Sequence, residues 1–399
     1  TTGGNNVALG YQSSYSNTIG INNVALGAGT LFTNTNSSNT VAIGWRALNQ
    51  LNGGVSNNAI GTSSQRYNET GLENTSFGHQ ALMGQSGTSF NYNTAIGSNS
   101  QHVITGSSNA SLGANTLKTA TSADGNVAIG ANALRELTTG DNNVGIGLSA
   151  LRYNQSGTHN IAIGDEAMKG VSGNSHNDNT AVGYESMIPI TTGSGNTSLG
   201  YQTLRAITTG SSNVAIGKQA LDAGTTVTSN VAVGGGALGT NVSGNYNTAV
   251  GQSCLLTNTT SFMTAVGYNA LRLNSSGGAN VGFGYNAGYG NNTGSFNTSI
   301  GYEAGKGVSN NANSNNTSVG YHALKSITTG NANVSMGREA LFLTTTARYQ
   351  VAIGFQALHS NTAGDNGVAI GYQALKNLNQ TTNTHVVAVG SSAGKEMTS

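Results

Sequence analysis

A single pentapeptide motif recurs along the whole chain. Asn-Val-Ala-Ile-Gly occurs unchanged at residues 126–130 and 213–217, and variants bring the total to 23 copies, the first ending at Gly10 and the last at Gly390. Successive motif glycines are separated by 17 residues in sixteen intervals, by 19 in four and by 16 in two. A fixed short period predicts a solenoid, in which each unit contacts mainly its neighbours.

The period also sets the expected domain organisation. A length of 399 residues would ordinarily suggest two or three globular domains. We expect instead one repetitive domain over residues 1–399, with repeats over about 5–394 and no separate globular domain. No apolar run is long enough for a membrane helix, so we expect no membrane insertion, and we expect no nucleic-acid partner. The single cysteine, Cys254, replaces a recurrent alanine, which predicts a small buried side chain.

The residues of one repeat favour β structure. Val or Thr and then Ile, Val or Leu alternate around a small residue, which is strand periodicity. Asn, Gly and Thr-Thr-Gly mark turns, and an Ala-Leu pair between them indicates a second short extended segment. No block is long enough for a helical repeat. The predicted fold is an all-β parallel β-solenoid, a β-roll or β-helix, of about 23 coils with a 17-residue repeat.

Two columns of the stacked motif predict how coils pack. The Ile column, which includes Ile129 and Ile216, is apolar in all 23 copies and is expected inside the coil, together with the motif threonines on the same face. The preceding column, which includes Ala128 and Ala215, is always Ala, Ser or Gly. Because side chains alternate along a strand, this column would face a very close neighbour, another sheet or another chain. A lone thin rod would expose much of its surface, and packing several rods through the small-residue column would bury it, so we predict a homotrimer.

The first motif position carries a third column. It is Asn in 18 of the 23 copies, and stacked amides are expected to form a hydrogen-bonded ladder and to close a turn. We interpret the motif as scaffold, with these structural residues in its two unchanged copies: Asn126, Ala128, Ile129, Gly130, Asn213, Ala215, Ile216 and Gly217.

The motif carries a resemblance to two kinds of fibre. Asn-Val-Ala-Ile-Gly-x-x-Ala/Ser in tandem resembles the head repeats of trimeric autotransporter adhesins, which form left-handed parallel β-rolls in threefold bundles. The longer unit, Gly-Tyr-Gln-Ala-Leu-x-x-x-Thr-Thr-Gly-x-x-Asn-Val-Ala-Ile-Gly, looks closer to the shafts of phage tail fibres and tailspikes, over residues 5–394.

The resemblance to phage fibres implies a function and a location. It implies a non-enzymatic structural and adhesive homotrimer in the virion tail, hence extracellular, which contacts other virion tail proteins. The fibre would project or mediate attachment to a host cell-surface glycan or protein receptor. The alternative is a bacterial trimeric adhesin head at the cell surface. A polysaccharide-degrading tailspike is the second alternative.

The residue types give no enzymatic constellation. The seven histidines occupy different phases of the repeat, without metal-ligand spacing. Asp165, Glu166 and Glu185 lie just after motif glycines, but two acids acting on a glycosidic bond need a cleft between them. We expect no catalytic residue, no cofactor and no metal. The tailspike alternative stays open because its carboxylates need not be close in sequence.

Recognition is expected where the copies differ from one another. Aromatic rings can stack on sugars, cations attract acidic polysaccharide, and insertions in solenoids often serve binding. The plainer interpretation is that the tyrosines contact each other and that the cations form a solvated edge. The candidate contacts are four tyrosines after motif glycines (Tyr268, Tyr285, Tyr302, Tyr321), four cations after Ala-Leu (Lys118, Arg135, Arg152, Lys169) and three side chains of the 19-residue coils (Phe90, Tyr92, His176).

Overall fold

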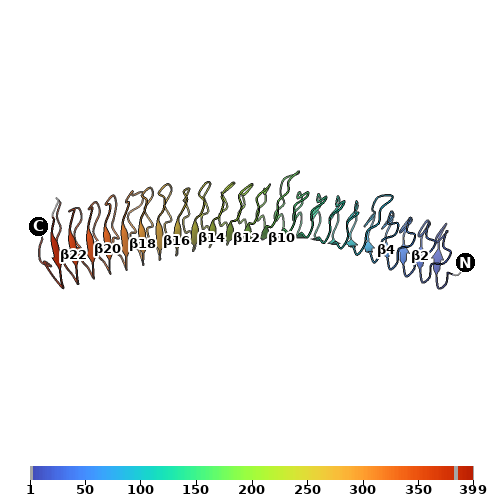
Figure 1. Ribbon diagram of the computed structural model, residues 1–399, viewed down its shortest axis with the longest axis horizontal. Helices are drawn as coiled ribbons and strands as arrows, with labels where there is room; N and C mark the ends of the chain where they lie inside the picture. The colour runs from blue at the N-terminus through green and yellow to red at the C-terminus, as the bar shows by residue number, and fades with distance from the viewer. Residues whose placement is uncertain (1–2, 382–384, 399) are drawn as a thin grey trace. The chain divides into compact units, whose positions relative to one another are not determined.

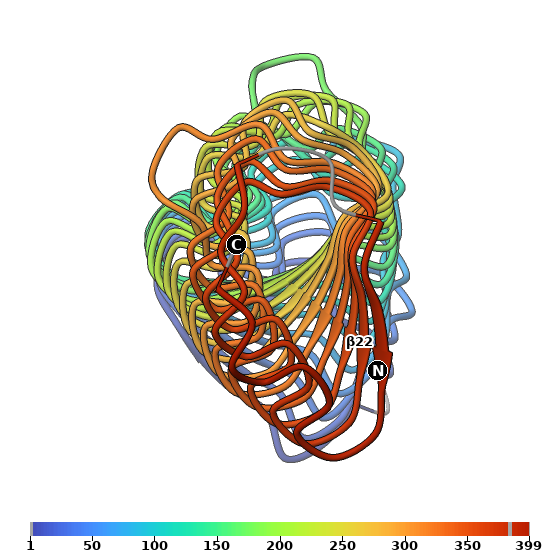
Figure 2. The same cartoon turned by 90° about the vertical axis from the view of Figure 1, so that its left-hand side faces the viewer.

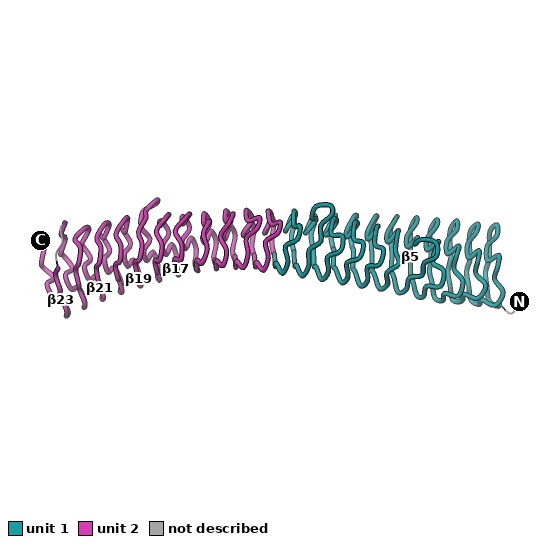
Figure 3. The backbone as a smooth tube through the Cα atoms, turned by 45° about the horizontal axis from the view of Figure 1, so that its top comes forward, with its two compact units in different colours: residues 1–198 teal, residues 199–399 magenta. Residues whose placement is uncertain are grey.

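The chain divides into two compact units, residues 1–198 and 199–399 (Figure 3). The structure is a computed structural model that describes residues 3–381 and 385–398. Each unit is a stack of coils, and each coil contributes one strand of three residues (Figure 1). Within the described ranges there is no helix, and therefore none long and apolar enough to cross a membrane.

The strands fall at the motif in every coil. Unit 1 contains β1 (Val7–Leu9), β2 (Val24–Leu26), β3 (Val41–Ile43), β4 (Asn58–Ile60), β5 (Thr75–Phe77), β6 (Thr94–Ile96), β7 (Ala110–Leu112), β8 (Val127–Ile129), β9 (Val144–Ile146), β10 (Ile161–Ile163) and β11 (Thr180–Val182). At the boundary lies β12 (Thr197–Leu199). Unit 2 contains β13 (Val214–Ile216), β14 (Val231–Val233), β15 (Thr248–Val250), β16 (Thr264–Val266), β17 (Val281–Phe283), β18 (Thr298–Ile300), β19 (Thr317–Val319), β20 (Val334–Met336), β21 (Val351–Ile353), β22 (Val368–Ile370) and β23 (Val387–Val389).

Within each unit, consecutive strands from β1 to β11 and from β13 to β23 pair in parallel, with each motif position on its counterpart. In unit 1, Ala128 of β8 lies opposite Gly145 of β9. In unit 2, Ala215 of β13 lies opposite Ala232 of β14. This register confirms the predicted all-β parallel β-solenoid with a repeat of about 17 residues.

The Ala-Leu segment is not a second strand. It consists of turns, and its leucines have left-handed backbone angles, with φ of 51° at Leu134 and 53° at Leu151. The N–H of Leu134 still donates to the carbonyl of Ala150 in the next coil at 2.9 Å. The prediction of two extended segments per repeat was therefore wrong. Coil-to-coil hydrogen bonds continue through this wall without extended backbone.

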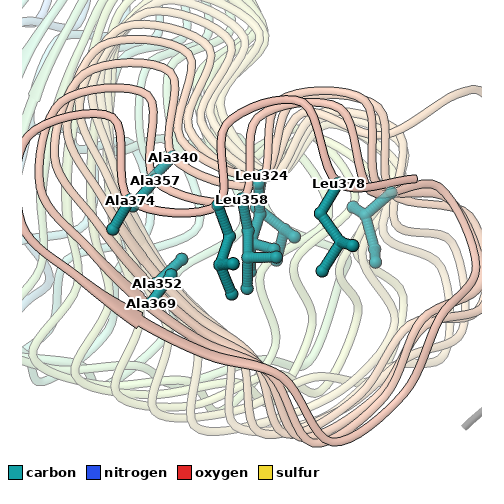
Figure 4. Close-up of a cluster of buried hydrophobic side chains, with 11 residues drawn as sticks. Leu324, Ala340, Ala352, Ala357, Leu358, Ala369, Ala374 and Leu378 are labelled. Carbon is teal, nitrogen blue, oxygen red and sulfur yellow. The ribbon is translucent and has the colours of Figure 1, made fainter. Parts of the chain in front are cut away.

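The small-residue column, and not the Ile column, lies inside the coil. The middle residue is buried in every strand from β2 to β22, whereas the first and third residues of these strands are partly or fully exposed. Ala128 is completely buried, and Ile129 beside it is 38% exposed. In unit 2, Ala352 and Ala369 lie on one wall, Ala340, Ala357 and Ala374 lie on the facing wall, and Leu358 points between them (Figure 4). The predicted facing of Ile129 and Ile216 was therefore wrong.

The reason is the close approach of the two walls of each coil. A Cβ built at Gly145 of β9 would lie 3.2 Å from Leu134 Cγ, and one at Gly282 of β17 would lie 2.8 Å from Leu271 Cγ. The leucines of the turn wall already fill the interior, so the facing strand has room only for Ala, Ser or Gly. The close neighbour predicted for this column is the opposite wall of the same coil. The Ile column and the motif threonines face outward instead.

The predicted Asn ladder is confirmed. Asn143 is buried, and its Nδ2 donates to Oδ1 of Asn126 in the preceding coil at 3.1 Å and to the carbonyl of Gly157 at 2.8 Å. Its own Oδ1 accepts from the backbone N–H of Asn160 at 3.1 Å. Each amide therefore satisfies buried groups of its own coil and of both neighbouring coils.

The motif glycines are required by backbone angle and by stacking. Gly130 and Gly217 have φ of 111° and 120°, a region that L side chains rarely adopt. A Cβ at Gly130 would lie 2.6 Å from the carbonyl oxygen of Gly147, and one at Gly217 would lie 2.8 Å from the carbonyl carbon of Gly234. A side chain at either motif glycine would therefore clash with the backbone of the next coil.

Enlarging the buried small column should destabilise the coil. Ala128→Leu forces three extra carbons between the walls, and overpacking of this kind costs about 1–3 kcal/mol. We expect a lower midpoint of thermal unfolding, followed by circular dichroism. Val127→Leu, on the outer face of the same strand, is the control and should leave the midpoint nearly unchanged. Equal effects of the two substitutions would contradict the inward facing of Ala128.

Removing one rung of the Asn ladder should also destabilise the stack. Asn143→Gly leaves the N–H of Asn160 and the carbonyl of Gly157 without their amide partners, at about 1–3 kcal/mol for a buried unsatisfied group. Asn142→Gly is the matched control, because Asn142 is exposed and its φ of 55° suits glycine. Chemical denaturation of both variants should show a loss of stability for Asn143→Gly alone.

Candidate recognition surfaces

The outer face of the sheet is uncharged and largely apolar in both units. The first and third positions of all 23 strands hold no charged residue, and the third is always apolar. In unit 1, Phe77 and Leu112 are 57% and 49% exposed, and in unit 2 Phe283 is 55% exposed. We call the exposed first and third strand positions of a unit its outer sheet face. A repeated apolar surface of this kind marks an interaction site in soluble proteins.

The four candidate tyrosines stack on one another in unit 2. Ring centroids are 5.5 Å apart for Tyr268 and Tyr285, 4.9 Å for Tyr285 and Tyr302, and 5.4 Å for Tyr302 and Tyr321, with nearly parallel planes. The two inner rings have a neighbour on both faces, which leaves their edges and hydroxyl groups to solvent. The tyrosines therefore contact each other, as one of the two interpretations of the sequence predicted. Their contact with a receptor stays a prediction.

The four candidate cations lie on consecutive coils of unit 1 and are half-buried. Lys118 and Arg135 line an open groove of about 330 Å³ together with Glu136. The guanidinium of Arg152 lies over the ring of Tyr153, 4.8 Å from its centroid, and Lys169 Nζ is 2.7 Å from Glu166 Oε1. Stacking and pairing hold two of these cations at the surface. Their contact with a receptor stays a prediction.

The 19-residue coils contain both buried and exposed candidates. Phe90 and His176 are 0% and 1% exposed, so neither side chain lies at the surface, and we withdraw both as receptor contacts. Both fill the interior three residues before the Asn ladder, where 17-residue coils often have glycine. Burial lowers the pKa of His176 to about 4, so its imidazole is neutral at pH 7. Tyr92 is exposed and remains a candidate.

Two of the insertions protrude from their unit as loops (Figure 2). One is the green loop around residues 171–179 of unit 1, where Ser172 Oγ donates to Glu136 Oε2 at 3.2 Å. The other is the orange loop around residues 308–316 of unit 2. The fourth insertion, 377–385, includes residues 382–384, which lie outside the described residues.

Next to the second loop, unit 2 carries a cluster of charged side chains around Glu303. The Glu303 side chain is 10% exposed, and its Oε1 lies 2.7 Å from Lys306 Nζ. Its Oε2 lies 2.8 Å from Lys325 Nζ and 3.2 Å from His322 Nε2. Two successive coils thus contribute to one ion-pair network, in which a nearly buried carboxylate orients two ammonium groups.

Burial and the neighbouring lysines shift the pKa values of Glu303 and His322 in this cluster. Burial alone would raise the pKa of Glu303, but the hydrogen bonds and charges of Lys306 and Lys325 outweigh burial and lower it to about 2. The pKa of His322 is lowered, first by burial and then by the charge of Lys325, with Glu303 acting in the opposite direction. At neutral pH the cluster therefore holds two ammonium groups, one carboxylate and a neutral imidazole.

Sequence reasoning missed the aromatic and cationic side chains of this column in unit 2. The position that holds the four cations of unit 1 holds Tyr289, Lys306, Lys325, Phe342 and His359 on five consecutive coils. The rings of Phe342 and His359 stack at 5.1 Å, and Lys325 Nζ lies 5.7 Å from the Phe342 centroid. Counting five residues on from each motif glycine would have found them. The Ala-Leu signature marks Lys325, Phe342 and His359, but it does not mark Tyr289 and Lys306, which follow Ala-Gly.

The acidic residues considered for catalysis are placed as follows. Glu166 is paired with Lys169, and Asp165 is exposed. Among residues 3–381 and 385–398, no three His, Cys, Asp or Glu side chains are grouped so that they could hold a metal ion. Cys254 is buried, as predicted, and burial raises its pKa to about 12.

Comparison with known proteins adds no family assignment. No protein-family model matches the sequence, and the search of curated proteins gives no match. The candidate surfaces therefore rest on the chain's own residues.

Acid should remove a stabilising contribution made by Glu303. Its folded pKa of about 2 lies below its ordinary value of 4.5, so the contribution is full above pH 4.5 and is lost as the pH falls toward 2. Glu303→Gln should lack this component. We expect the difference in unfolding midpoint between the original chain and the variant to shrink from pH 6 to about pH 2. A difference that is constant over this range would contradict the lowered pKa.

Proposed function

We propose that this chain is the repetitive shaft of a non-enzymatic, homotrimeric adhesive fibre, of the kind found in phage tails, that projects or mediates attachment to a host surface. The observation that carries the proposal is the outer sheet face. Along each unit, successive strands leave two uncharged positions exposed on the side away from the coil interior, and the third strand position is apolar in every strand.

The outer sheet face suits a second copy of the chain as its partner. A copy has the same strand spacing, about 4.8 Å per coil, so the apolar third-position columns of two copies can meet coil for coil over many repeats. Neither column contains a charge that would be buried unpaired in such a contact. The number of three copies comes from the resemblance to threefold fibres and adhesin heads. The interface differs from the one first predicted, because the small-residue column is used inside each coil.

Assembly through this face leaves the turn wall of each coil available for recognition. The cations of unit 1, the protruding loops and the Glu303 cluster lie on turns outside the strands. Scaffold and recognition thus use different parts of the same repeat. The partners would be a host cell-surface glycan or protein receptor and other virion tail proteins, in an extracellular virion tail.

Charges placed on the outer sheet face should dissociate the fibre without unfolding the coil. Ile129 and Ile163 are each 38% exposed in the single chain, so lysine is tolerated there unless a partner covers the face. We expect sedimentation to give three chain masses for the original protein and one for the variant with Ile129→Lys and Ile163→Lys. Circular dichroism should be unchanged.

A matched variant separates the effect of position from the effect of charge. Ser122→Lys and Thr139→Lys add the same charges at exposed turn positions of unit 1 and should leave the mass at three chains. An original protein that sediments at one chain mass, 40.2 kDa, would overturn the assembly and with it the proposed fibre.

A further inference from the structure

Beside the loop at residues 308–316, unit 2 has an open groove of about 470 Å³. Its lining residues are Tyr289, Lys306, Gly307, Val308, Ser309, Lys325 and Ser326. Three consecutive coils form it, and the first residues of the loop form one wall. The groove brings together an aromatic ring, two ammonium groups and two hydroxyl groups. None of these side chains was among the predicted contacts.

We propose that this groove binds a saccharide that carries carboxylate groups. Lys306 and Lys325 would receive the carboxylates, the ring of Tyr289 would pack against a sugar ring, and Ser309 and Ser326 would exchange hydrogen bonds with sugar hydroxyls. The inference rests on the proposed adhesive function, for which it supplies the chemical class of receptor.

The two ammonium groups are positioned but not neutralised. Both lie within 2.8 Å of one carboxylate, Glu303, and their side chains remain 30% and 29% exposed. A single carboxylate cannot balance two ammonium groups, so the site carries an excess positive charge beside the groove. Because Glu303 already restrains both lysine side chains, each of them loses less conformational entropy when a ligand binds.

The side chains around the groove extend the surface along unit 2. Arg272 Nη1 lies 3.4 Å from Tyr289 Oη, and Phe342 lies on the other side of Lys325, with its ring within 5.7 Å of that ammonium group. Cations and rings therefore share one column at the spacing of successive coils. A chain of acidic sugars meets repeated charge and ring contacts along such a surface. A net charge of +1 for the whole protein gives no broad electrostatic footprint for nucleic acid.

The test is calorimetric titration of the full chain with trigalacturonate. Maltotriose is the uncharged control, and a short single-stranded oligonucleotide is the control for anionic charge of another class. We expect binding of trigalacturonate only, weakened by salt. Replacing both Lys306 and Lys325 by Gln should weaken binding by about tenfold or more. Lys376→Gln, in the same column but outside the groove, should have no effect.

A second variant distinguishes loss of binding from loss of folding, because it leaves the ion pairs of Glu303 in place. Ser309→Trp fills the groove from its exposed loop without removing charge, and it should also abolish binding. No binding of trigalacturonate by the original chain, preference for the oligonucleotide, or equal loss with Lys376→Gln would each overturn the inference.

The outcome is separable from that of the proposed function. The groove lies within one chain, so its binding can be measured in any assembly state. A trimer that does not bind the trisaccharide would overturn the groove alone. A single chain that binds would overturn the fibre alone.

Discussion

The close approach of the two walls of each coil is the constraint on which the rest of the structure depends. Leucines of the turn wall fill the interior, so the strand wall presents only Ala, Ser or Gly to it. Because strand side chains alternate, the neighbours of that small residue must face outward. The same steric limit that gives a thin coil therefore also directs the first and third strand positions to the outer sheet face.

Stacking of the coils depends on polar and backbone groups in addition to this packing. The buried Asn ladder links each coil to its neighbours, and the motif glycines allow adjacent turns to lie in contact. Because each rung is local, one coil can be lengthened or given a new surface residue without changing the others. That independence explains how a uniform scaffold carries a cationic surface in unit 1 and a mixed aromatic and cationic surface in unit 2.

The sequence predicted the architecture well because the repeat phase is a strong signal. The strand positions, the parallel register and the Asn ladder were all predicted from it. Which face of the strand points inward could not be predicted in this way. Alternation shows that Ala128 and Ile129 point in opposite directions, but it does not show which of them points into the coil. The deciding feature is the left-handed backbone at leucines such as Leu134, a conformation that the residue type does not suggest. The burial of Phe90 and His176 and the network around Glu303 likewise depend on how particular side chains pack between coils.

Thiol reactivity at two adjacent positions tests the central claim most directly. Cysteines would replace Ala128 and Ile129 in separate variants of the native protein, which would then be treated with a short bismaleimide; Cys254 is buried and serves as the internal reference. The account predicts no reaction at position 128 and covalent links between chains at position 129. A reactive thiol at 128, or a thiol at 129 that is labelled without linking chains, would contradict it.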